Sequence, residues 1–352
     1  MHLTILGAGA IAQAAAALAA SRGHVVTLWS PSGAGTAGIA GRLTAEGAVN
    51  GTFPLRIARD LADALAGADA AVLAVPAYAY PTLLPRIAEA LRVPLLISPA
   101  ASLAPLALDA MLAAQGAARD RPAIGAMSTT PVTARRLRPD RVRVAAIRAA
   151  VDVAAVPANA AAALGELATM LFGHAAPIGP NVLQAGLGNA NPIIHAALAL
   201  TNATRIETAE AWPQYRMMTP ATCRLMEAMA AERERLAEGF GMAVLGLEES
   251  LHRANGVPRG RLHAMAATIA ASRGAVLGPT EMDTRYVTED VPYGLAFYLW
   301  LAAARGIAMP VTEAVVTTLE ALWGRELRSN LLLQALDPST LDAALESGIG
   351  RS

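Results

Sequence analysis

Hydrophobic positions follow two different patterns along the chain, and the change lies near residue 180. Before it, short apolar runs such as His2–Leu6, Ala70–Val75 and Pro94–Ser98 recur between alanine-rich or amphipathic segments. Continuous apolar runs are typical of parallel strands buried on both faces, and their alternation with helical segments predicts an α/β sheet. After it, strand patterns disappear and helical spacing dominates. We expect a doubly wound parallel sheet over residues 1–179 and an all-α domain over residues 180–352.

Other segments complete the expected outline. Val142–Ile147 and Val151–Val156 are predicted as further strands of the first half of the chain. In the second half, Thr219–Phe240 carries apolar residues at helical spacing, which predicts an amphipathic helix. Its charged residues, Glu232 and Arg233 among them, are expected to face solvent.

Composition excludes several classes of partner. Lys+Arg and Asp+Glu number 28 each, and only 4% of the residues are aromatic, so neither a basic field nor stacking platforms for nucleic acid or anionic membrane are present. The single cysteine, Cys223, excludes an intrachain disulfide framework and a multi-cysteine metal site. The apolar start lacks the basic region of a signal peptide, and no later run has the roughly 18 apolar residues of a membrane span. We expect a cytoplasmic protein with small-molecule substrates and no metal, and the apolar second half is compatible with a homodimer.

The first apolar run is followed at once by G-A-G-A-I-A at residues 7–12, the G-x-G-x-x-A form of the Rossmann dinucleotide-binding fingerprint. In this pattern Gly7 permits a tight turn, Gly9 lets the backbone approach a pyrophosphate, and Ala12 keeps helix and strand close. The helix amino terminus then offers free N–H groups to the phosphates. The alternative is a glycine-rich βα turn without a ligand.

His24–Trp29 is the second predicted strand, and its end lacks the acidic residue that holds the ribose hydroxyls in NAD enzymes. Ser30 and Ser32 stand there instead and are suited to a 2′-phosphate, with help from Arg42, which favours NADP(H) over NAD(H). An NAD site that does without the acid is the alternative. The arginine run within residues 135–143 is interpreted either as a solvated strand edge or as help in binding phosphate or carboxylate. Pro76, at the end of the predicted strand Ala70–Val75, is a further candidate. The candidate cofactor residues are Gly7, Ala8, Gly9, Ala10, Ile11, Ser30, Ser32 and Pro76.

His195 lies in the first turn of a predicted helix, whose start is marked by Asn191 as cap and Pro192 in the first helical position. The positive end of the helix dipole disfavours the charged imidazole, so a histidine there can exchange a proton near neutral pH. A core histidine satisfied by one hydrogen bond is the alternative.

A second dense patch, residues 278–295, carries Arg285 and Asp290 ahead of an apolar helix that begins near Pro292. A guanidinium matches a substrate carboxylate with two charge-assisted hydrogen bonds, and an aspartate can fix the tautomer of a base histidine. The alternatives are that Asp290 caps the following helix and that Arg285 pairs with a neighbouring carboxylate.

The motifs G-N-A-N-P-I-I-H at residues 188–195 and R-Y-V-T-E-D-V-P-Y-G-L at residues 285–295 resemble the two signature regions of the octopine/opine dehydrogenases. Members of that family reduce the imine formed between a 2-oxo acid and the amine of an amino acid. The resemblance implies that His195 is the proton-transfer histidine, that Asp290 is its acidic partner, and that NADP(H) or NAD(H) is the cofactor. Arg285 as the carboxylate binder is inferred from its chemistry, and Asn191 is a further candidate for substrate binding.

Two other functions fit the same residues. A 2-hydroxy acid or ketopantoate-type dehydrogenase has the same layout but reduces a ketone without an amine. A non-catalytic protein that senses NADP(H) binds the cofactor but has no need of a histidine–aspartate proton relay.

Overall fold

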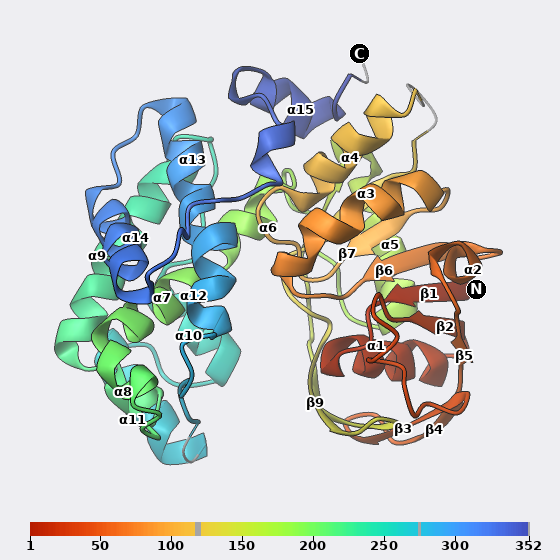
Figure 1. Cartoon of the computed structure of the whole chain (residues 1–352), viewed down its shortest axis with the longest axis horizontal. Helices are drawn as coiled ribbons and strands as arrows, with labels where there is room; N and C mark the ends of the chain where they lie inside the picture. The colour runs from red at the N-terminus through yellow and green to blue at the C-terminus, as the bar shows by residue number, and fades with distance from the viewer. Residues whose placement is uncertain (117–120, 274–275, 351–352) are drawn as a thin grey trace. The chain divides into compact units, whose positions relative to one another are not determined.

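The computed structural model describes residues 1–116, 121–273 and 276–350 and divides into two units (Figure 1). The first unit comprises Met1–Gly186 together with Leu332–Ser352, and the second comprises Leu187–Leu331. This division differs from the expected one at residues 179 and 180, because the helical unit starts later and the carboxy-terminal residues belong to the first unit.

The first unit is built on a seven-stranded sheet in the order β11-β8-β7-β6-β1-β2-β5. All its pairings are parallel except that of β11 with β8. The apolar runs of the sequence form its central strands, buried on both faces, which confirms the predicted doubly wound α/β fold. Its strands are β1 (His2–Leu6), β2 (Val25–Trp29), β5 (Arg56–Ile57), β6 (Ala70–Leu73), β7 (Leu95–Ile97), β8 (Ile124–Met127) and β11 (Val153–Val156).

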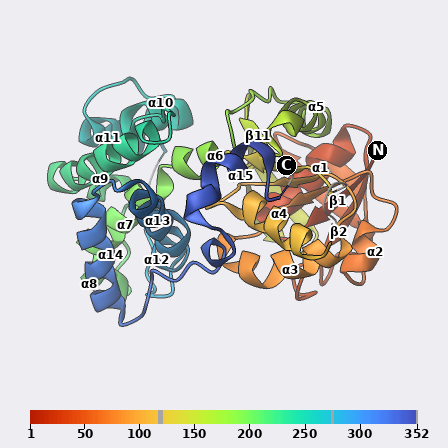
Figure 2. The same cartoon turned by 90° about the horizontal axis from the view of Figure 1, so that it is seen from above.

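Helices cover both faces of this sheet. Figure 2 shows α3 and α4 on one face and α1 and α5 on the other. The helices of the unit are α1 (Ala10–Ser21), α2 (Leu61–Leu65), α3 (Tyr80–Ala90), α4 (Ala104–Ala114), α5 (Ala161–Phe172) and α15 (Leu341–Ser347), while α6 (Leu183–Gly188) spans the boundary between the units.

A second, four-stranded sheet lies on the side of α1 away from β1 and β2 (Figure 1). Its order is β4-β3-β10-β9, and β10 (Arg141–Ile147) confirms the strand predicted over Val142–Ile147. This strand belongs to the small sheet because its burial alternates: Val142 and Val144 are buried, and Arg141, Arg143 and Ala145 are exposed, as in a sheet with one solvated face. The other strands of this small sheet are β3 (Arg42–Gly47), β4 (Gly51–Pro54) and β9 (Val132–Arg138).

The alanines of α1 fill the space between the two sheets. Every residue from Ala12 to Ala19 is buried, and these side chains share one core with Leu43 of β3 and Val142 of β10. A helix buried on opposite sides needs small side chains to approach both sheets, and alanine also has the highest helix propensity. The position of α1 is therefore fixed from both sides, together with the turn that precedes it.

A buried ion pair ties the carboxy-terminal segment to the first unit. Arg121 Nε lies 2.9 Å from Asp109 Oδ1, and the two side chains are 1% and 0% exposed. The backbone N–H of Ile349 donates to Asp109 Oδ2 at 2.7 Å, and α15 packs against β11. These contacts explain why the last residues do not belong to the helical unit.

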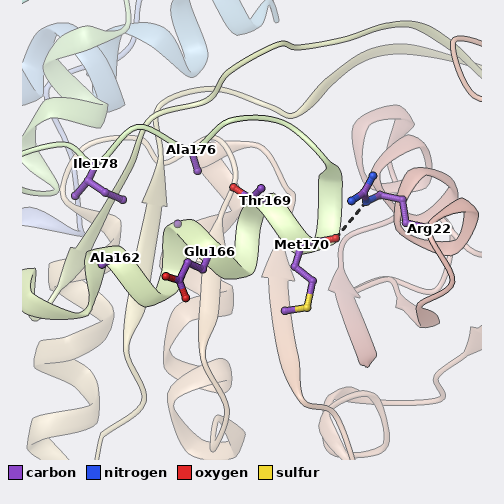
Figure 3. A pocket seen from close by; sticks show the side chains of 8 residues that line it. Arg22, Ala162, Glu166, Thr169, Met170, Ala176 and Ile178 are labelled. Atoms are coloured by element: carbon purple, nitrogen blue, oxygen red, sulfur yellow. Dashed lines mark hydrogen bonds between the residues drawn. The ribbon is translucent and has the colours of Figure 1, made fainter.

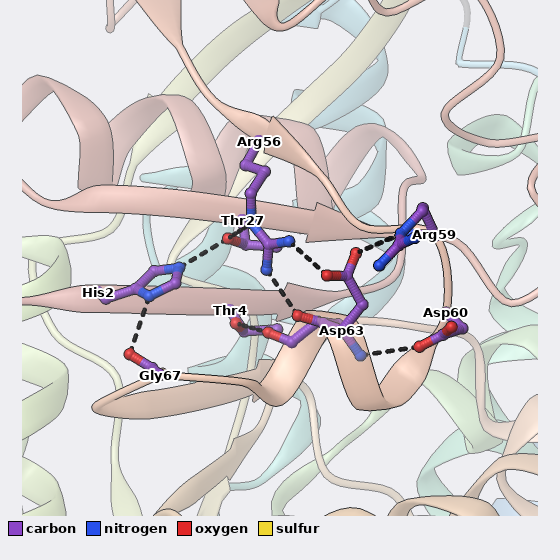
Figure 4. A network of polar contacts seen from close by, with 9 residues as sticks. His2, Thr4, Thr27, Arg56, Arg59, Asp60, Asp63 and Gly67 are labelled. Carbon is purple, nitrogen blue, oxygen red and sulfur yellow. Dashed lines mark hydrogen bonds and ion pairs between the residues drawn. The ribbon is translucent and has the colours of Figure 1, made fainter.

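Polar groups at the β1–β2 side of the sheet satisfy one another (Figure 4). His2 Nε2 lies 2.7 Å from Thr27 Oγ1, and Arg56 Nε donates to the same hydroxyl at 3.2 Å. Arg56 also pairs with Asp63 at 2.9 Å, and the hydroxyl of Thr4 donates to the carbonyl of Ala64. These contacts join α2 and β5 to β1 and β2 at this end of the sheet, so the network has a structural role.

His174, after α5, is a buried neutral histidine. Its side chain stacks near Phe172, its Nδ1 lies 2.9 Å from the carbonyl of Ala175, and its Nε2 has no hydrogen-bond partner in the described part of the chain. Burial lowers the pKa of His174 below its ordinary value of 6.5, and the charge of Arg22 acts in the same direction, against the hydrogen bond to Ala175.

We expect this histidine to make stability depend on pH. The unfolded chain takes up a proton near pH 6.5, which the folded chain binds only at lower pH, so the free energy of unfolding falls as the pH drops below 6.5. Urea unfolding at pH 7.5 and at pH 5.5 measures this effect. The decrease in the free energy of unfolding from pH 7.5 to pH 5.5 should be smaller for His174→Gln than for the wild type. Equal losses would show that His174 contributes nothing to the pH dependence.

In the described part of the second unit, helices account for the regular structure apart from one isolated bridge between Pro213 and Leu277. None of the helices in the described residues has the length and apolar character needed to cross a membrane. The helices are α7 (Asn191–Thr201), α8 (Ala203–Glu207), α9 (Pro220–Glu238), α10 (Leu247–Asn255), α11 (Leu262–Arg273), α12 (Arg285–Thr288), α13 (Ala296–Arg305) and α14 (Pro310–Trp323).

Two charged residues of α9 are buried, contrary to the expectation that they face solvent. Glu232 and Arg233 are 2% and 0% exposed. The Glu232 carboxylate accepts hydrogen bonds from the backbone N–H groups of Val311 and Thr312, both at 2.8 Å. It therefore caps the amino terminus of α14, where orphan N–H groups and the helix dipole favour a negative charge.

Candidate active site

The glycine turn after β1 has the geometry that a bound pyrophosphate requires. Gly7 has φ +129°, and a Cβ atom there would lie 2.3 Å from the carbonyl oxygen of Ala74, so only glycine fits. A Cβ at Gly9 would meet nothing within 4 Å, which leaves open space beside the backbone. The first turn of α1 carries no acidic residue, and its N–H groups have no partner within the helix. These residues fit a dinucleotide phosphate group.

The predicted cofactor residues lie at the same edge of the sheet. Leu6 pairs with Trp29 of β2 and with Leu73 of β6, so the residues that follow all three strands come together. Ser30 is buried, and its hydroxyl accepts a hydrogen bond from the backbone N–H of Gly35 at 3.2 Å. Ser30 thus also shapes the loop after β2.

The remaining candidates also belong to the first unit. Ser32, in the loop after β2, and Arg42 are exposed, and Pro76 lies in the turn after β6. Arg42 begins β3. No carboxylate follows β2, because the loop from residue 30 to residue 41 contains no Asp or Glu.

The start of α7 differs in detail from the prediction. Asn191 is the first residue of the helix rather than its cap, and its backbone N–H donates to Asn189 Oδ1 at 3.0 Å. Pro192 therefore occupies the second position, where its missing N–H costs nothing. The Asn191 side chain is exposed, so it is presented at the helix end but takes no part in capping.

His195 and Asp290 are brought together, although they lie 95 residues apart in the sequence. His195 Nδ1 is 2.8 Å from Asp290 Oδ2, and the two side chains are only 11% and 7% exposed. Nε2 has no hydrogen-bond partner among the residues that the structure describes. A carboxylate on Nδ1 holds the imidazole in the tautomer that leaves Nε2 as the acceptor.

A π-helix over Val291–Leu295 places Asp290 beside α7. A Cβ atom at Gly294 would lie 2.4 Å from the ring of Pro192, so glycine is needed for this turn to approach the start of α7. Asp290 immediately precedes the π-helix but makes no capping hydrogen bond, since its carboxylate contacts His195 instead. Single π-turns of this kind are frequent at functional sites.

Tyr286 is a site residue that the sequence analysis missed. Its ring stacks on the imidazole of His195, with ring centroids 3.8 Å apart and an angle of 7° between the planes. Its hydroxyl donates to Gln214 Oε1 at 2.5 Å, and burial raises its pKa to about 12. The phenol therefore stays protonated and holds the imidazole plane from one side. Its place directly after Arg285 was the available signal, but no sequence rule assigns it to the histidine.

Arg285 stands at the start of α12 and is largely exposed. Its Nε lies 4.0 Å from Glu289 Oε2, with 61% of the arginine side chain accessible. A contact at this distance between an exposed and a partly exposed side chain is weak. Its guanidinium is consequently accessible to a soluble anion.

Cys223 and clusters of metal-ligating side chains are the other groups that could form a reactive site. Burial raises the pKa of the Cys223 thiol to about 11, with the charges of Glu227 and Glu248 adding to the effect, so a thiolate nucleophile is disfavoured. Within the described ranges, no three His, Cys, Asp or Glu side chains are grouped to hold a metal ion.

An open groove of about 530 Å³ lies on the first unit, where Arg22 donates to the carbonyl of Met170 (Figure 3). None of the predicted site residues lines it. Its lining residues are Arg22, Ala162, Gly165, Glu166, Thr169, Met170, Ala176 and Ile178.

Family models match both halves of the chain. Residues 178–323 match the α-helical domain of NAD/NADP octopine/nopaline dehydrogenases, and residues 2–102 match the domain of F420-dependent NADP oxidoreductases. Among solved structures, octopine dehydrogenase with NADH and L-arginine has a TM-score of 0.80 at 20% identity, covering 98% of each chain. Yersinopine dehydrogenase with bound NADP⁺ has a TM-score of 0.72 at 19% identity, again covering 98% of each chain.

Sequence identity extends the likeness beyond the fold. The opine dehydrogenase of Arthrobacter sp. (strain 1C) is 31% identical over 349 residues, which is 97% of this chain and 96% of that protein. The chain belongs to the opine dehydrogenase family of NAD(P)-dependent oxidoreductases that act on CH–NH bonds.

Proposed function

We propose that this enzyme joins a 2-oxo acid to the amine of an amino acid by reductive condensation, with NADPH favoured over NADH. The oxo acid and the amine form a carbinolamine, which loses water to give an imine. Reduction of the imine carbon then yields a secondary-amine dicarboxylate. The observation that carries the proposal is the contact between His195 Nδ1 and Asp290 at 2.8 Å.

His195 has the geometry for the proton transfers in this sequence. With Nδ1–H donated to Asp290, Nε2 can accept a proton from the incoming amine and return one to the departing hydroxyl group. Asp290 stabilises the imidazolium that forms in between, and Tyr286 keeps the ring plane fixed. When bound, the nicotinamide supplies the hydride.

Assays of NADPH oxidation test this function. Pyruvate and 2-oxoglutarate are each offered with and without a panel of amino acids, and the proposal expects oxidation only when both partners are present. Oxidation with the oxo acid alone would favour the ketone-reducing alternative. Tight NADPH binding without turnover across the whole panel would favour the sensor.

Arg285 is proposed to hold a substrate carboxylate. Charged hydrogen bonds of this kind contribute about 1.5–3 kcal/mol, so Arg285→Met should raise a substrate KM by roughly 10- to 100-fold. The KM of Arg285→Lys should lie between those of the wild type and Arg285→Met, because lysine keeps the charge but cannot form the two parallel hydrogen bonds of a guanidinium. Steady-state kinetics for each substrate in turn identify which carboxylate is held, and an unchanged KM for both substrates in Arg285→Met would remove Arg285 from substrate binding.

A cytoplasmic location and a homodimeric assembly remain predictions that accompany this proposal.

Asn191 is proposed as a second contact to the substrate, because it is exposed at the end of the helix that carries His195.

A further inference from the structure

The turn that joins β9 to β10 presents two exposed arginines. Arg138 and Arg141, which we call the tip arginines, stand directly opposite each other across the two strands. The Arg136 guanidinium donates to the carbonyl groups of Arg138 and Pro139, both at 3.3 Å. The turn is therefore braced by a third arginine.

This turn touches both segments that surround the adenosine ribose in dinucleotide-binding folds. Gln13 of α1 is fully buried, and its Nε2 donates to the carbonyl of Pro139 at 3.1 Å and to that of Ala8, in the glycine turn, at 3.3 Å. On its other side, Pro139 packs on the loop after β2, where a Cβ at Gly38 would lie 3.0 Å from the proline ring. In these folds the ribose lies between the glycine turn and the end of the second strand.

The tip arginines carry like charges directly opposite each other, and Asp140, which lies between them in the turn, forms no ion pair with either one in the described part of the chain. Like charges directly opposite across a strand pair are destabilising, and neither arginine forms an ion pair with any residue that the structure describes. Arg42 adds a third charge, because it lies two residues before Thr44, the neighbour of Arg141 on β3. A cost of this kind is offset when an anion binds between the guanidinium groups.

The loop after β2 is suited to the same anion. An acidic residue there would repel a 2′-phosphate, but the loop has none. Ser30 is committed to the backbone of Gly35, while Ser32 is exposed and carries a hydroxyl donor. The positive charges available to this loop are those of Arg42 and the tip arginines, with Asp140 as the acidic residue of the same turn.

We propose that Arg138 and Arg141 bind the 2′-phosphate of NADP(H) and set the preference of this enzyme for NADPH over NADH. The inference rests on the proposed function only in that NADP(H) is the cofactor. A guanidinium recognises phosphate through paired, charge-assisted hydrogen bonds, which a ribose hydroxyl cannot reproduce.

Ligand binding, rather than turnover, provides the test. Isothermal titration of the full chain with NADPH, NADH, 2′,5′-ADP and 5′-ADP measures the contribution of the 2′-phosphate with and without nicotinamide. The wild type should bind both 2′-phosphorylated ligands at least about tenfold more tightly than their counterparts. Arg138→Gln and Arg141→Gln should each raise the Kd for NADPH and for 2′,5′-ADP by about tenfold. The Kd for NADH should change by less than about twofold in both variants.

Arg143→Gln is the matched control. Arg143 lies on the same face of β10 but pairs in register with Glu46 of β3, away from the turn. Its replacement should change the ratio of NADPH to NADH affinity by less than about twofold. The proposal is overturned if the tip variants keep the wild-type ratio of NADPH to NADH affinity, or if they weaken the binding of both cofactors equally. It is also overturned if the wild type binds NADH more tightly than NADPH. Amine-dependent turnover is measured separately, so its absence would contradict the proposed function and leave the binding result readable.

Discussion

Replacing His195 with alanine is expected to lower kcat by about 10²- to 10⁴-fold while leaving the Kd for NADPH almost unchanged. This range is typical of the loss of a general acid–base group. The imidazole is held by Asp290 and Tyr286 in the second unit, whereas the glycine turn that we propose to bind the cofactor belongs to the first. Steady-state kinetics with both substrates saturating, together with a titration of NADPH, measure the two effects separately.

His263→Ala is the control for this experiment, because His263 lies on α11 of the same unit and is not among the site residues. Its kcat should stay close to that of the wild type. Near-normal turnover in His195→Ala would exclude the histidine from proton transfer, and a parallel loss of NADPH binding would point to a structural role.

Replacing Asp109 with asparagine is expected to lower the free energy of unfolding by about 3–5 kcal/mol, the usual loss when one partner of a buried ion pair is removed. Arg121 is buried against Asp109 and would lose this charge-assisted contact. The asparagine side chain has nearly the same volume as the aspartate it replaces, so the loss would report the charge rather than a cavity. Urea unfolding followed by circular dichroism measures it.

Two further variants sharpen this result. Asp109→Leu combined with Arg121→Met removes both charges and should recover much of the loss, since apolar replacements of buried pairs are often neutral. Glu210→Gln breaks the exposed pair with Arg205 and should change stability by less than about 1 kcal/mol. If Asp109→Asn unfolds like the wild type, the buried pair does not anchor the carboxy-terminal segment.

Local signals were enough to predict the central strands of the main sheet and the glycine turn that follows β1. The continuous apolar run of β1 predicts a buried strand, and Gly7 after it has the positive φ and the close approach to Ala74 that the glycine pattern indicates. The small sheet was not predicted as a separate sheet. β3 and β4 are short and partly exposed, and β10, which pairs with β3, is separated from them in the sequence by most of the strands of the main sheet.

The two motifs of the second unit predicted which residues would meet but not how they meet. The contact of His195 with Asp290 depends on the π-turn and on Gly294 against Pro192, which no helical periodicity encodes. Tyr286 was missed because stacking on a histidine leaves no pattern in the sequence.

Long-range contacts also explain the wrong expectation for α9. Charged residues at helical spacing normally face solvent, but the Glu232 carboxylate satisfies the start of α14, some 80 residues further along the chain. Such a partner is visible only in the folded structure.

A double-mutant cycle on kcat for amine-dependent NADPH oxidation addresses the proton-transfer pair most directly. His195→Ala, Asp290→Ala and the double variant are compared at saturating substrate and cofactor. If the aspartate acts only through the imidazole, the double variant should be no slower than His195→Ala, to within about twofold. Losses that multiply in the double variant would mean that the two residues act independently, and the account given for this pair would be wrong.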